Sequence, residues 1–260
     1  EYLKKKIIKN IPNILGSNKK KRIIYFSYID GKQIIRPKKD HLNKCLNFLK
    51  QINYKTTYKN FKFQKASDAC LSIKDHINTC ESRINKLIIK YNYKKNNESK
   101  KIYNFLKRQI IPEFKIIKSN IKNSFTKSQI KKKLNNNKLI LSPSDFGFHN
   151  IITKDNQIYF IDFEYAGWDD PRKLLCDFIL NPDYSILKKD KIFFLTNFDQ
   201  IFKTKISNSD EFRVILKFHF LKWVCMIINQ INLKFSKKQI NMKYFKKAVN
   251  YFQVNKRILK

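Results

Sequence analysis

The stretch that decides the fold reads Leu141-Ser-Pro-Ser-Asp145-Phe-Gly-Phe-His-Asn150-Ile-Ile152, followed by Ile158-Tyr-Phe-Ile-Asp162-Phe-Glu164-Tyr165. Short apolar runs flank the first loop, and residues 157–161 form a β-prone run that follows a turn at Lys154-Asp-Asn156. The order is apolar run, polar loop, hairpin, acidic residue. It predicts a loop carrying Asp145 and Asn150 beside a hairpin that delivers Asp162.

An Asp with an Asn five residues later has the spacing of a kinase catalytic loop. In that geometry Asp145 accepts the proton of an attacking hydroxyl, and Asn150 helps to hold Mg²⁺. Asp162 then supplies the carboxylate that bridges the metal to the phosphates of ATP. A solvated loop is the alternative, since the chain is rich in Asn, but the flanking apolar runs and the hairpin favour phosphotransferase geometry.

The tripeptide Asp145-Phe146-Gly147 also spells the metal-binding Asp-Phe-Gly of eukaryotic protein kinases. In those kinases the tripeptide follows the catalytic loop, and no such loop lies upstream of Asp145. The order of the motifs therefore indicates Asp145 as the base and Asp162 as the metal ligand.

These residues resemble a known family. Residues 142–150, with Ile161-Asp-Phe-Glu-Tyr-Ala-Gly-Trp-Asp-Asp-Pro171 and Leu175-Cys-Asp177-Phe178, are similar to bacterial members of the aminoglycoside phosphotransferase/choline kinase family. The resemblance implies a protein-kinase-like fold, ATP and Mg²⁺ as cofactors, and a small-molecule hydroxyl as phosphate acceptor. An aminoglycoside, choline, a sugar or a polysaccharide precursor all remain open as that acceptor. The likeness extends more weakly to residues 22–31, as the strand linking two lobes, and to residues 221–228, as a late helix.

The family pattern assigns further roles and is broken in one place. Many relatives carry His-Gly-Asp, where this chain has Pro143-Ser144-Asp145, so a supporting His is absent. His149 either approaches substrate or satisfies a loop carbonyl, and the second role is favoured. Glu164 is either a further metal-shell carboxylate, on the same side of an extended segment as Asp162, or a surface charge. Asp177 resembles the family's structural Asp, which accepts backbone N–H bonds from the catalytic loop.

The expected fold class is α+β and mostly helical: a kinase-like C-lobe over 32–260, with the catalytic loop at 141–152 and the metal-binding hairpin at 153–165. Residues 1–31 are expected to be a remnant of an N-lobe. No Gly-rich phosphate loop or Val-Ala-Ile-Lys-like lysine is recognisable, so the ATP-binding residues are unknown. We therefore expect a fragment or the product of a truncated gene, and a catalytically incompetent kinase-like fragment is the alternative function. Periodicity predicts helices at 41–52, 66–91, 99–118 with a kink or split at Pro112, 171–181, 186–205, 209–233 and 237–258.

The formal charge of +36 makes a basic nucleic-acid-binding protein the third candidate. Only seven of the 56 basic residues are Arg, however, and the lysines are spread from end to end, which argues against that function. Five cysteines without paired spacing indicate reduced thiols and a cytoplasmic protein. No apolar run approaches the ~18–20 residues that span a bilayer. The sequence does not indicate an oligomeric state.

Overall fold

The computed structural model describes residues 2–5, 8–18, 20–21, 23–92, 97–231 and 242–259. The chain divides into two compact units. Unit 1 comprises residues 1–69 and 135–207, and unit 2 comprises residues 70–134 and 208–260. The loop and the hairpin singled out above both belong to unit 1.

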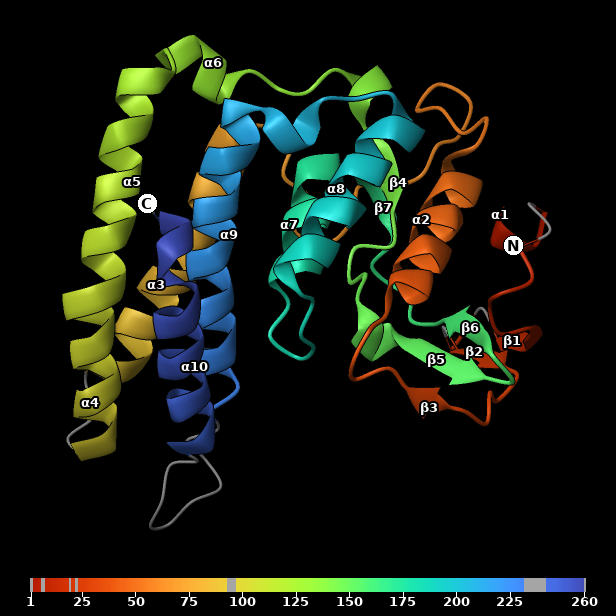
Figure 1. Ribbon diagram of the computed structural model, residues 1–260, viewed down its shortest axis with the longest axis horizontal. Coiled ribbons are helices and arrows are strands. Elements are labelled where there is room, and N and C mark those ends of the chain that lie inside the picture. The colour runs from red at the N-terminus through yellow and green to blue at the C-terminus, as the bar shows by residue number, and fades with distance from the viewer. Residues whose placement is uncertain are drawn as a thin grey trace. The chain divides into compact units, whose positions relative to one another are not determined.

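Unit 1 combines short strands with helices (Figure 1). Its described helices are α1 (Tyr2–Lys5), α2 (Lys39–Asn53), α7 (Pro171–Leu180) and α8 (Lys188–Phe202). Its described strands are β1 (Ile14–Asn18), β2 (Ile23–Phe26), β3 (Lys32–Gln33), β4 (Ile140–Ser142), β5 (Ile151–Lys154), β6 (Gln157–Phe160) and β7 (Gly167–Asp169). These strands pair antiparallel, in the orders β1-β2, β3-β5-β6 and β4-β7.

The predicted hairpin is present as β5 and β6. Their turn lies at Asp155 and Asn156, which both have positive φ values of 49° and 59°. Asp and Asn adopt this left-handed conformation more readily than other non-Gly residues, so the local sequence specifies the turn. The register pairs Ile151 with Phe160. Because of this pairing, the residues that follow β6 lie opposite the end of the loop.

Aromatic side chains form the core that holds loop and hairpin together. Phe48 of α2 stacks on Phe160 of β6 with centroids 3.9 Å apart, and Phe146 of the loop stacks on Phe178 of α7 at 5.5 Å. Phe178 in turn stacks on Phe194 of α8 at 4.2 Å. All five rings are buried, at 5% exposure or less. Burying a Phe side chain stabilises the fold by roughly 1.5–3 kcal/mol, so the loop is anchored from beneath.

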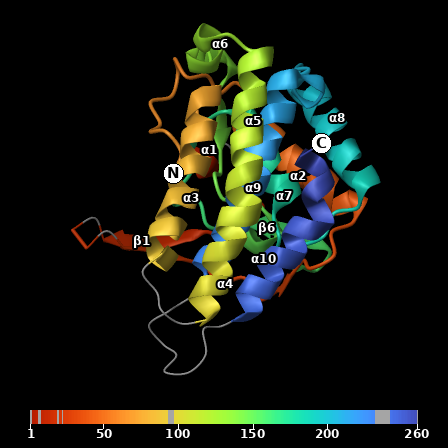
Figure 2. The ribbon, with the colours of Figure 1, turned by 90° about the vertical axis from the view of Figure 1, so that its left-hand side faces the viewer.

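Unit 2 is helical in its described part, and Figure 2 shows its long helices running side by side. Its helices are α3 (Ile73–Asn92), α4 (Asn97–Phe105), a π-helix (Leu106–Ile110), α5 (Ile111–Ser124), α6 (Lys127–Lys131), α9 (Asp210–Asn229), α10 (Met242–Asn255) and a 3₁₀ turn (Lys256–Leu259). The helix α9 packs against α3, α5 and α10. Its buried face is broad because most of its residues from Phe212 to Ile228 are apolar.

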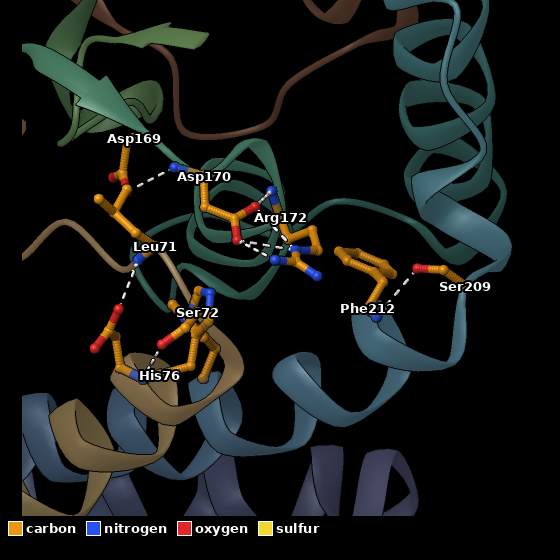
Figure 3. Close-up of polar contacts among 10 residues, drawn as sticks. Leu71, Ser72, His76, Asp169, Asp170, Arg172, Ser209 and Phe212 are labelled. Carbon is orange, nitrogen blue, oxygen red and sulfur yellow. Dashed lines mark hydrogen bonds and ion pairs between the residues drawn. The ribbon is translucent and has the colours of Figure 1, made fainter. Parts of the chain in front are cut away.

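Helix ends in unit 2 follow capping rules. Before α3, the Ser72 hydroxyl accepts the N–H of Asp75 at 3.2 Å, and the Asp75 carboxylate accepts the N–H of Leu71 at 3.0 Å (Figure 3). At the start of α9, the Ser209 hydroxyl accepts the N–H of Phe212 at 3.2 Å. Pro112 takes the first turn of α5, directly after the π-helix, so a π-helical turn rather than a break marks the predicted kink or split.

The predicted helices are present with shifted ends. Residues 66–72 precede α3 rather than belonging to it, and residues 237–241 of the last predicted helix lie outside the described residues. Residue 22 of the predicted linker strand also lies outside them, and β2 begins at Ile23. All five cysteines are buried, and none of them forms a disulfide. Across the described residues, no helix combines the length and apolar character needed to cross a bilayer.

Candidate active site

The loop after β4 begins with a sharp turn. Ser144 has φ 69°, and its N–H donates to the Ser142 hydroxyl at 3.0 Å. The Asp145 N–H donates to the carbonyl oxygen of Pro143 at 3.0 Å, and the Asp145 side chain is left 49% exposed. Ser144 stands where the family pattern has Gly, and a left-handed φ explains why Gly suits that position. A non-Gly residue there costs roughly 1–2 kcal/mol, which the rest of the loop must offset.

Asn150 ends a 3₁₀ turn (Phe148–Asn150), and its N–H donates to the carbonyl oxygen of Gly147 at 2.9 Å. Its side-chain Nδ2 donates to the backbone carbonyl oxygen of Asp145 at 3.0 Å. A carbonyl oxygen only accepts hydrogen bonds, so the amide group facing it must be the NH₂. The amide oxygen therefore points away from the Asp145 main chain, where it can serve as a metal ligand.

Asp162 lies beside Asn150 at the open end of the hairpin. The N–H of Ile161, the residue before Asp162, donates to the carbonyl oxygen of Asn150 at 3.0 Å. Asp162 is exposed and has φ 62°, so the chain turns sharply as it leaves β6. Strained backbone of this kind is concentrated at functional sites. The structure thus brings loop and hairpin residues together as the motif order predicted.

His149 contacts the predicted base directly. Its Nε2 lies 3.0 Å from Oδ1 of Asp145, and its Nδ1 lies 3.2 Å from Nδ2 of Asn181. The favoured prediction, that the His149 ring satisfies a loop carbonyl, is therefore wrong. The loop folds back so that residues four apart meet, and both ring nitrogens are used by side chains.

The two side chains shift each other's pKa. The hydrogen bond from His149 lowers the pKa of Asp145 below its ordinary value, although burial and the charge of Asp177 act in the opposite direction. Burial alone would lower the pKa of His149, but the hydrogen bond and charge of Asp145 outweigh it and raise that pKa. The charges of Asp183 and Asp162 also raise the pKa of His149, so three carboxylates act on one imidazole.

Glu164 does not follow Asp162 along an extended strand. The left-handed backbone at Asp162 and a turn closed by the bond from the Ala166 N–H to the Phe163 carbonyl oxygen, 3.1 Å, both intervene. The expectation that the two carboxylates share one side of an extended segment is wrong for this reason. Glu164 is exposed, and its hydrogen bond and charge raise the pKa of its neighbour Tyr165.

Asp177 projects from α7, whose start is firmly held. The Asp170 carboxylate caps α7 by accepting the Arg172 N–H at 2.8 Å, and it binds the Arg172 guanidinium at 2.6 Å (Figure 3). In the same first turn, the buried Nζ of Lys173 lies 3.1 Å from Asp169 and 3.5 Å from Asp177. The negative charge of Asp177 acts to raise the pKa of Asp145. Its expected bonds to loop N–H groups remain a prediction.

The oxygen ligands available here suit Mg²⁺ better than a metal ion that is coordinated by protein groups alone. Asn150 and Asp162 offer one amide and one carboxylate oxygen, and Mg²⁺ is usually held by one or two such ligands together with substrate phosphates and water. Within the described ranges, no group of three or more His, Cys, Asp or Glu side chains gathers into a metal site. The residues present therefore fit a metal that arrives with a nucleotide.

Sequence reasoning missed two residues that support the site. Lys173 is 3% exposed between two carboxylates, and its spacing of four from Asp177 in the same helix is a salt-bridge signal that could have been used. Asn181 is 6% exposed and bonds His149, although 32 residues separate the two. No local pattern in the sequence indicates that second contact.

Comparison with known proteins supports the assignment at the level of the fold. No protein-family model and no curated protein sequence matches the chain. Among solved structures, an ethanolamine kinase from Plasmodium vivax matches 97% of this chain and 69% of its own length, with a TM-score of 0.59 and 14% identity. The chain has a kinase-like fold. The α+β, mostly helical class predicted from the sequence is confirmed.

Two phosphotransferases of solved structure share this kinase-like fold. A spectinomycin phosphotransferase in complex with ADP and spectinomycin matches 96% of this chain and 75% of its own length, with a TM-score of 0.57 and 16% identity. An ADP-bound aminoglycoside phosphotransferase matches 99% of this chain and 80% of its own length, with a TM-score of 0.53 and 16% identity. These structures belong to the group of small-molecule kinases that the sequence motifs resemble.

Proposed function

We propose that this chain transfers the γ-phosphate of ATP to a hydroxyl group of a small molecule. The observation that carries the proposal is the linked geometry of three residues. Asn150 braces the main chain of Asp145 through its amide, and Asp162 follows Ile161, whose N–H binds the Asn150 carbonyl oxygen. A hydroxyl-activating carboxylate and two oxygen ligands for a metal thus stand on one loop and one hairpin.

Asp145 acts on the acceptor. Its carboxylate is half exposed and its pKa is lowered by the His149 hydrogen bond, so it is ionised at neutral pH and can accept a proton. The bond between the acceptor oxygen and the γ-phosphorus forms as the bond from that phosphorus to ADP breaks. The hydroxyl proton passes to the Asp145 carboxylate, and ADP leaves with the electron pair.

Asn150 and Asp162 would hold Mg²⁺ through the amide oxygen and the carboxylate. When bound, the ion neutralises negative charge on the transferring phosphoryl group. Asp162 is exposed where the chain turns after β6, so its carboxylate is open to the nucleotide phosphates that would lie there. The proposal names no residue that binds adenine and no phosphate-binding lysine.

The acceptor is proposed by class only. The structural neighbours include kinases of ethanolamine and choline, and phosphotransferases of aminoglycosides and spectinomycin. All of these acceptors present hydroxyl groups on small polar molecules. We extend that class to this chain, with sugars and polysaccharide precursors as further candidates, and we place the reaction in the cytoplasm.

The test compares Asp145→Asn with the matched variant Asp155→Asn, which makes the same charge change in the hairpin turn. Transfer of labelled γ-phosphate is measured with choline, ethanolamine, spectinomycin and an aminoglycoside. ATP binding is measured by calorimetry with and without Mg²⁺. We expect Asp145→Asn to lower kcat by about 10²- to 10⁴-fold while ATP binding is kept. Asp155→Asn should behave like the unmodified chain.

Two results would refute the assigned roles. Undiminished transfer in Asp145→Asn would remove Asp145 from the chemistry. Loss of ATP binding in the same variant would show that Asp145 holds the nucleotide rather than the acceptor.

A further inference from the structure

The imidazole of His149 is held at both of its nitrogens. Nε2 lies 3.0 Å from Oδ1 of Asp145, and Nδ1 lies 3.2 Å from Nδ2 of Asn181. The His149 side chain is 22% exposed and Asn181 is 6% exposed, whereas the Asp145 side chain is 49% exposed. The ring therefore links a buried amide to the half-exposed carboxylate of the proposed base.

The hydrogen-bond partners decide where the ring proton lies. The backbone N–H of Asp183 donates to Oδ1 of Asn181 at 2.9 Å, so that amide oxygen faces Asp183. The Asn181 group facing His149 must then be the NH₂, which only donates. Nδ1 of His149 has to accept from it, and the single proton of the neutral ring lies on Nε2. That proton points at Oδ1 of Asp145.

Gly147 makes room for this ring. A Cβ atom at Gly147 would lie 2.7 Å from Cε1 and 2.8 Å from Nδ1 of His149, closer than real Cβ contacts allow. On the main chain, the Gln33 side chain donates to the His149 carbonyl oxygen at 3.0 Å. Both the backbone and the ring of His149 are therefore fixed, and the fixed ring defines one orientation of the Asp145 carboxylate.

We propose that His149 is a positioning residue for the proposed base: through Asn181 it is locked as the Nε2–H tautomer, and its hydrogen bond to Oδ1 orients the Asp145 carboxylate so that Oδ2 meets the acceptor hydroxyl. This inference rests on the proposed function. An exposed carboxylate otherwise rotates freely about its last torsion. Phosphoryl transfer depends chiefly on positioning, so fixing that torsion acts on the rate rather than on binding.

The first test separates the hydrogen bond from the shape of the ring. His149→Phe keeps a flat ring but cannot donate, whereas the amide of His149→Gln can donate to Asp145. With choline, ethanolamine, spectinomycin and an aminoglycoside as acceptors, we expect His149→Phe to lower kcat roughly 10- to 100-fold with KM for ATP unchanged. His149→Gln should recover part of that loss. Equal kcat in the unmodified chain and His149→Phe would overturn the inference.

A second route moves the ring without removing it. Gly147→Ala should push His149 from its place and lower kcat in the same way, with Gly16→Ala in the exposed strand β1 as the matched control. If Gly147→Ala lowers kcat in the His149→Phe background as strongly as it does alone, the substitution does not act through His149. That result would contradict the inference.

A third measurement needs no turnover. The ¹⁵N chemical shifts of the His149 ring, followed to alkaline pH until they stop changing, report the tautomer of the neutral imidazole. We expect Nε2–H in the unmodified chain and a mixture of tautomers in Asn181→Leu. A dominant Nδ1–H tautomer in the unmodified chain would overturn the inference even if Asp145 is catalytic.

The outcomes distinguish the proposed phosphotransferase function from the proposed role of His149. A dead Asp145→Asn with a fully active His149→Phe would leave the proposed function standing and refute the role of His149. An unmodified chain that transfers phosphate to none of the acceptors and hydrolyses no ATP would refute both the function and a role of His149 in it.

Discussion

The side-chain amide of Asn150 donates to the main-chain carbonyl oxygen of Asp145 at 3.0 Å, so the proposed metal ligand also braces the proposed base. Asn150→Asp places a carboxylate oxygen against that carbonyl and removes the donor. We expect the free energy of unfolding to fall by about 1–3 kcal/mol, the usual cost of leaving a polar group without its partner. Urea unfolding measures this change.

The control for Asn150→Asp is Asn156→Asp, which adds the same charge in the exposed turn between β5 and β6. The Nδ2 of Asn156 makes no contact with Asp145, so the free energy of unfolding of Asn156→Asp should change by less than about 0.5 kcal/mol. Equal losses in the two variants would show that the charge, rather than the brace, is responsible.

Asp162 supports a second prediction, because its backbone and its side chain have separate consequences. With φ 62°, the position favours Gly, Asn or Asp. Asp162→Asn should keep the free energy of unfolding but lose Mg²⁺-dependent ATP binding. Asp162→Ala should lose the binding and also about 1–2 kcal/mol of stability. Calorimetric titration of ATP and thermal unfolding measure the two effects.

Asp155 offers the matched pair for that experiment, since it has φ 49° in the hairpin turn. Asp155→Ala should show the same backbone cost, and neither Asp155 variant should alter ATP binding. Magnesium-dependent ATP binding that survives in Asp162→Asn would contradict the assignment of Asp162 as a metal ligand.

Gly167 predicts a third and larger effect. A Cβ atom there would lie 2.4 Å from the carbonyl oxygen of Gln64 and 2.5 Å from the backbone nitrogen of Ala66. Backbone cannot rotate aside as a side chain does, so Gly167→Ala must separate β7 from the segment at 64–66. We expect a loss of more than about 2 kcal/mol in unfolding experiments.

Gly16→Ala is the comparison for Gly167→Ala, because a Cβ atom at Gly16 meets only Cδ2 of Tyr25, at an ordinary 3.8 Å. Its effect should lie within about 0.5 kcal/mol. If the two glycine variants are equally stable, the close approach at β7 does not exist in solution.

Asp199 gives a prediction about how the stability of the chain depends on pH. Burial would raise its pKa, but hydrogen bonds from Ser207, Thr204 and the backbone N–H of Ile206 outweigh it and lower that pKa. A lowered folded-state pKa means that the stabilisation is present above the unfolded value, about 3.9, and is lost as the pH falls through the folded value. Asp199→Asn should therefore lower stability at neutral pH and remove part of the acid dependence.

Urea unfolding of Asp199→Asn from neutral to acidic pH, beside Asp155→Asn in the exposed hairpin turn, measures this contribution. The stability curves of Asp199→Asn and the unmodified chain should converge in acid. Parallel curves over the whole range would show that the hydrogen bonds at Asp199 do not depend on its charge.

Much of the site could be predicted from the sequence because its signals are local. The spacing of Asp145 and Asn150 and the β-prone run that ends before Asp162 are set by one loop and one hairpin. The structure joins them through the hydrogen bond from the Ile161 N–H to the Asn150 carbonyl oxygen, eleven residues apart. The N-cap at Asp170, directly before Pro171, is a further local signal.

The rest depends on contacts that sequence spacing does not encode. His149 and Asn181 meet only because α7 returns its C-terminal end to the loop, and the tautomer depends on a third residue, Asp183. The expected relation of Glu164 to Asp162 requires an extended backbone, whereas one residue in the left-handed conformation redirects the chain. Both cases turn on backbone geometry rather than on residue type.

The five buried thiols make the local opening of each unit measurable. Burial raises the pKa of Cys45 and Cys80 well above the usual thiol range, so the nucleophilic thiolate is scarce in the folded state. Cys45 and Cys176 belong to unit 1, and Cys70, Cys80 and Cys225 belong to unit 2. The rate at which a thiol reagent modifies each cysteine therefore reports how often its own unit exposes its interior, without any engineered label.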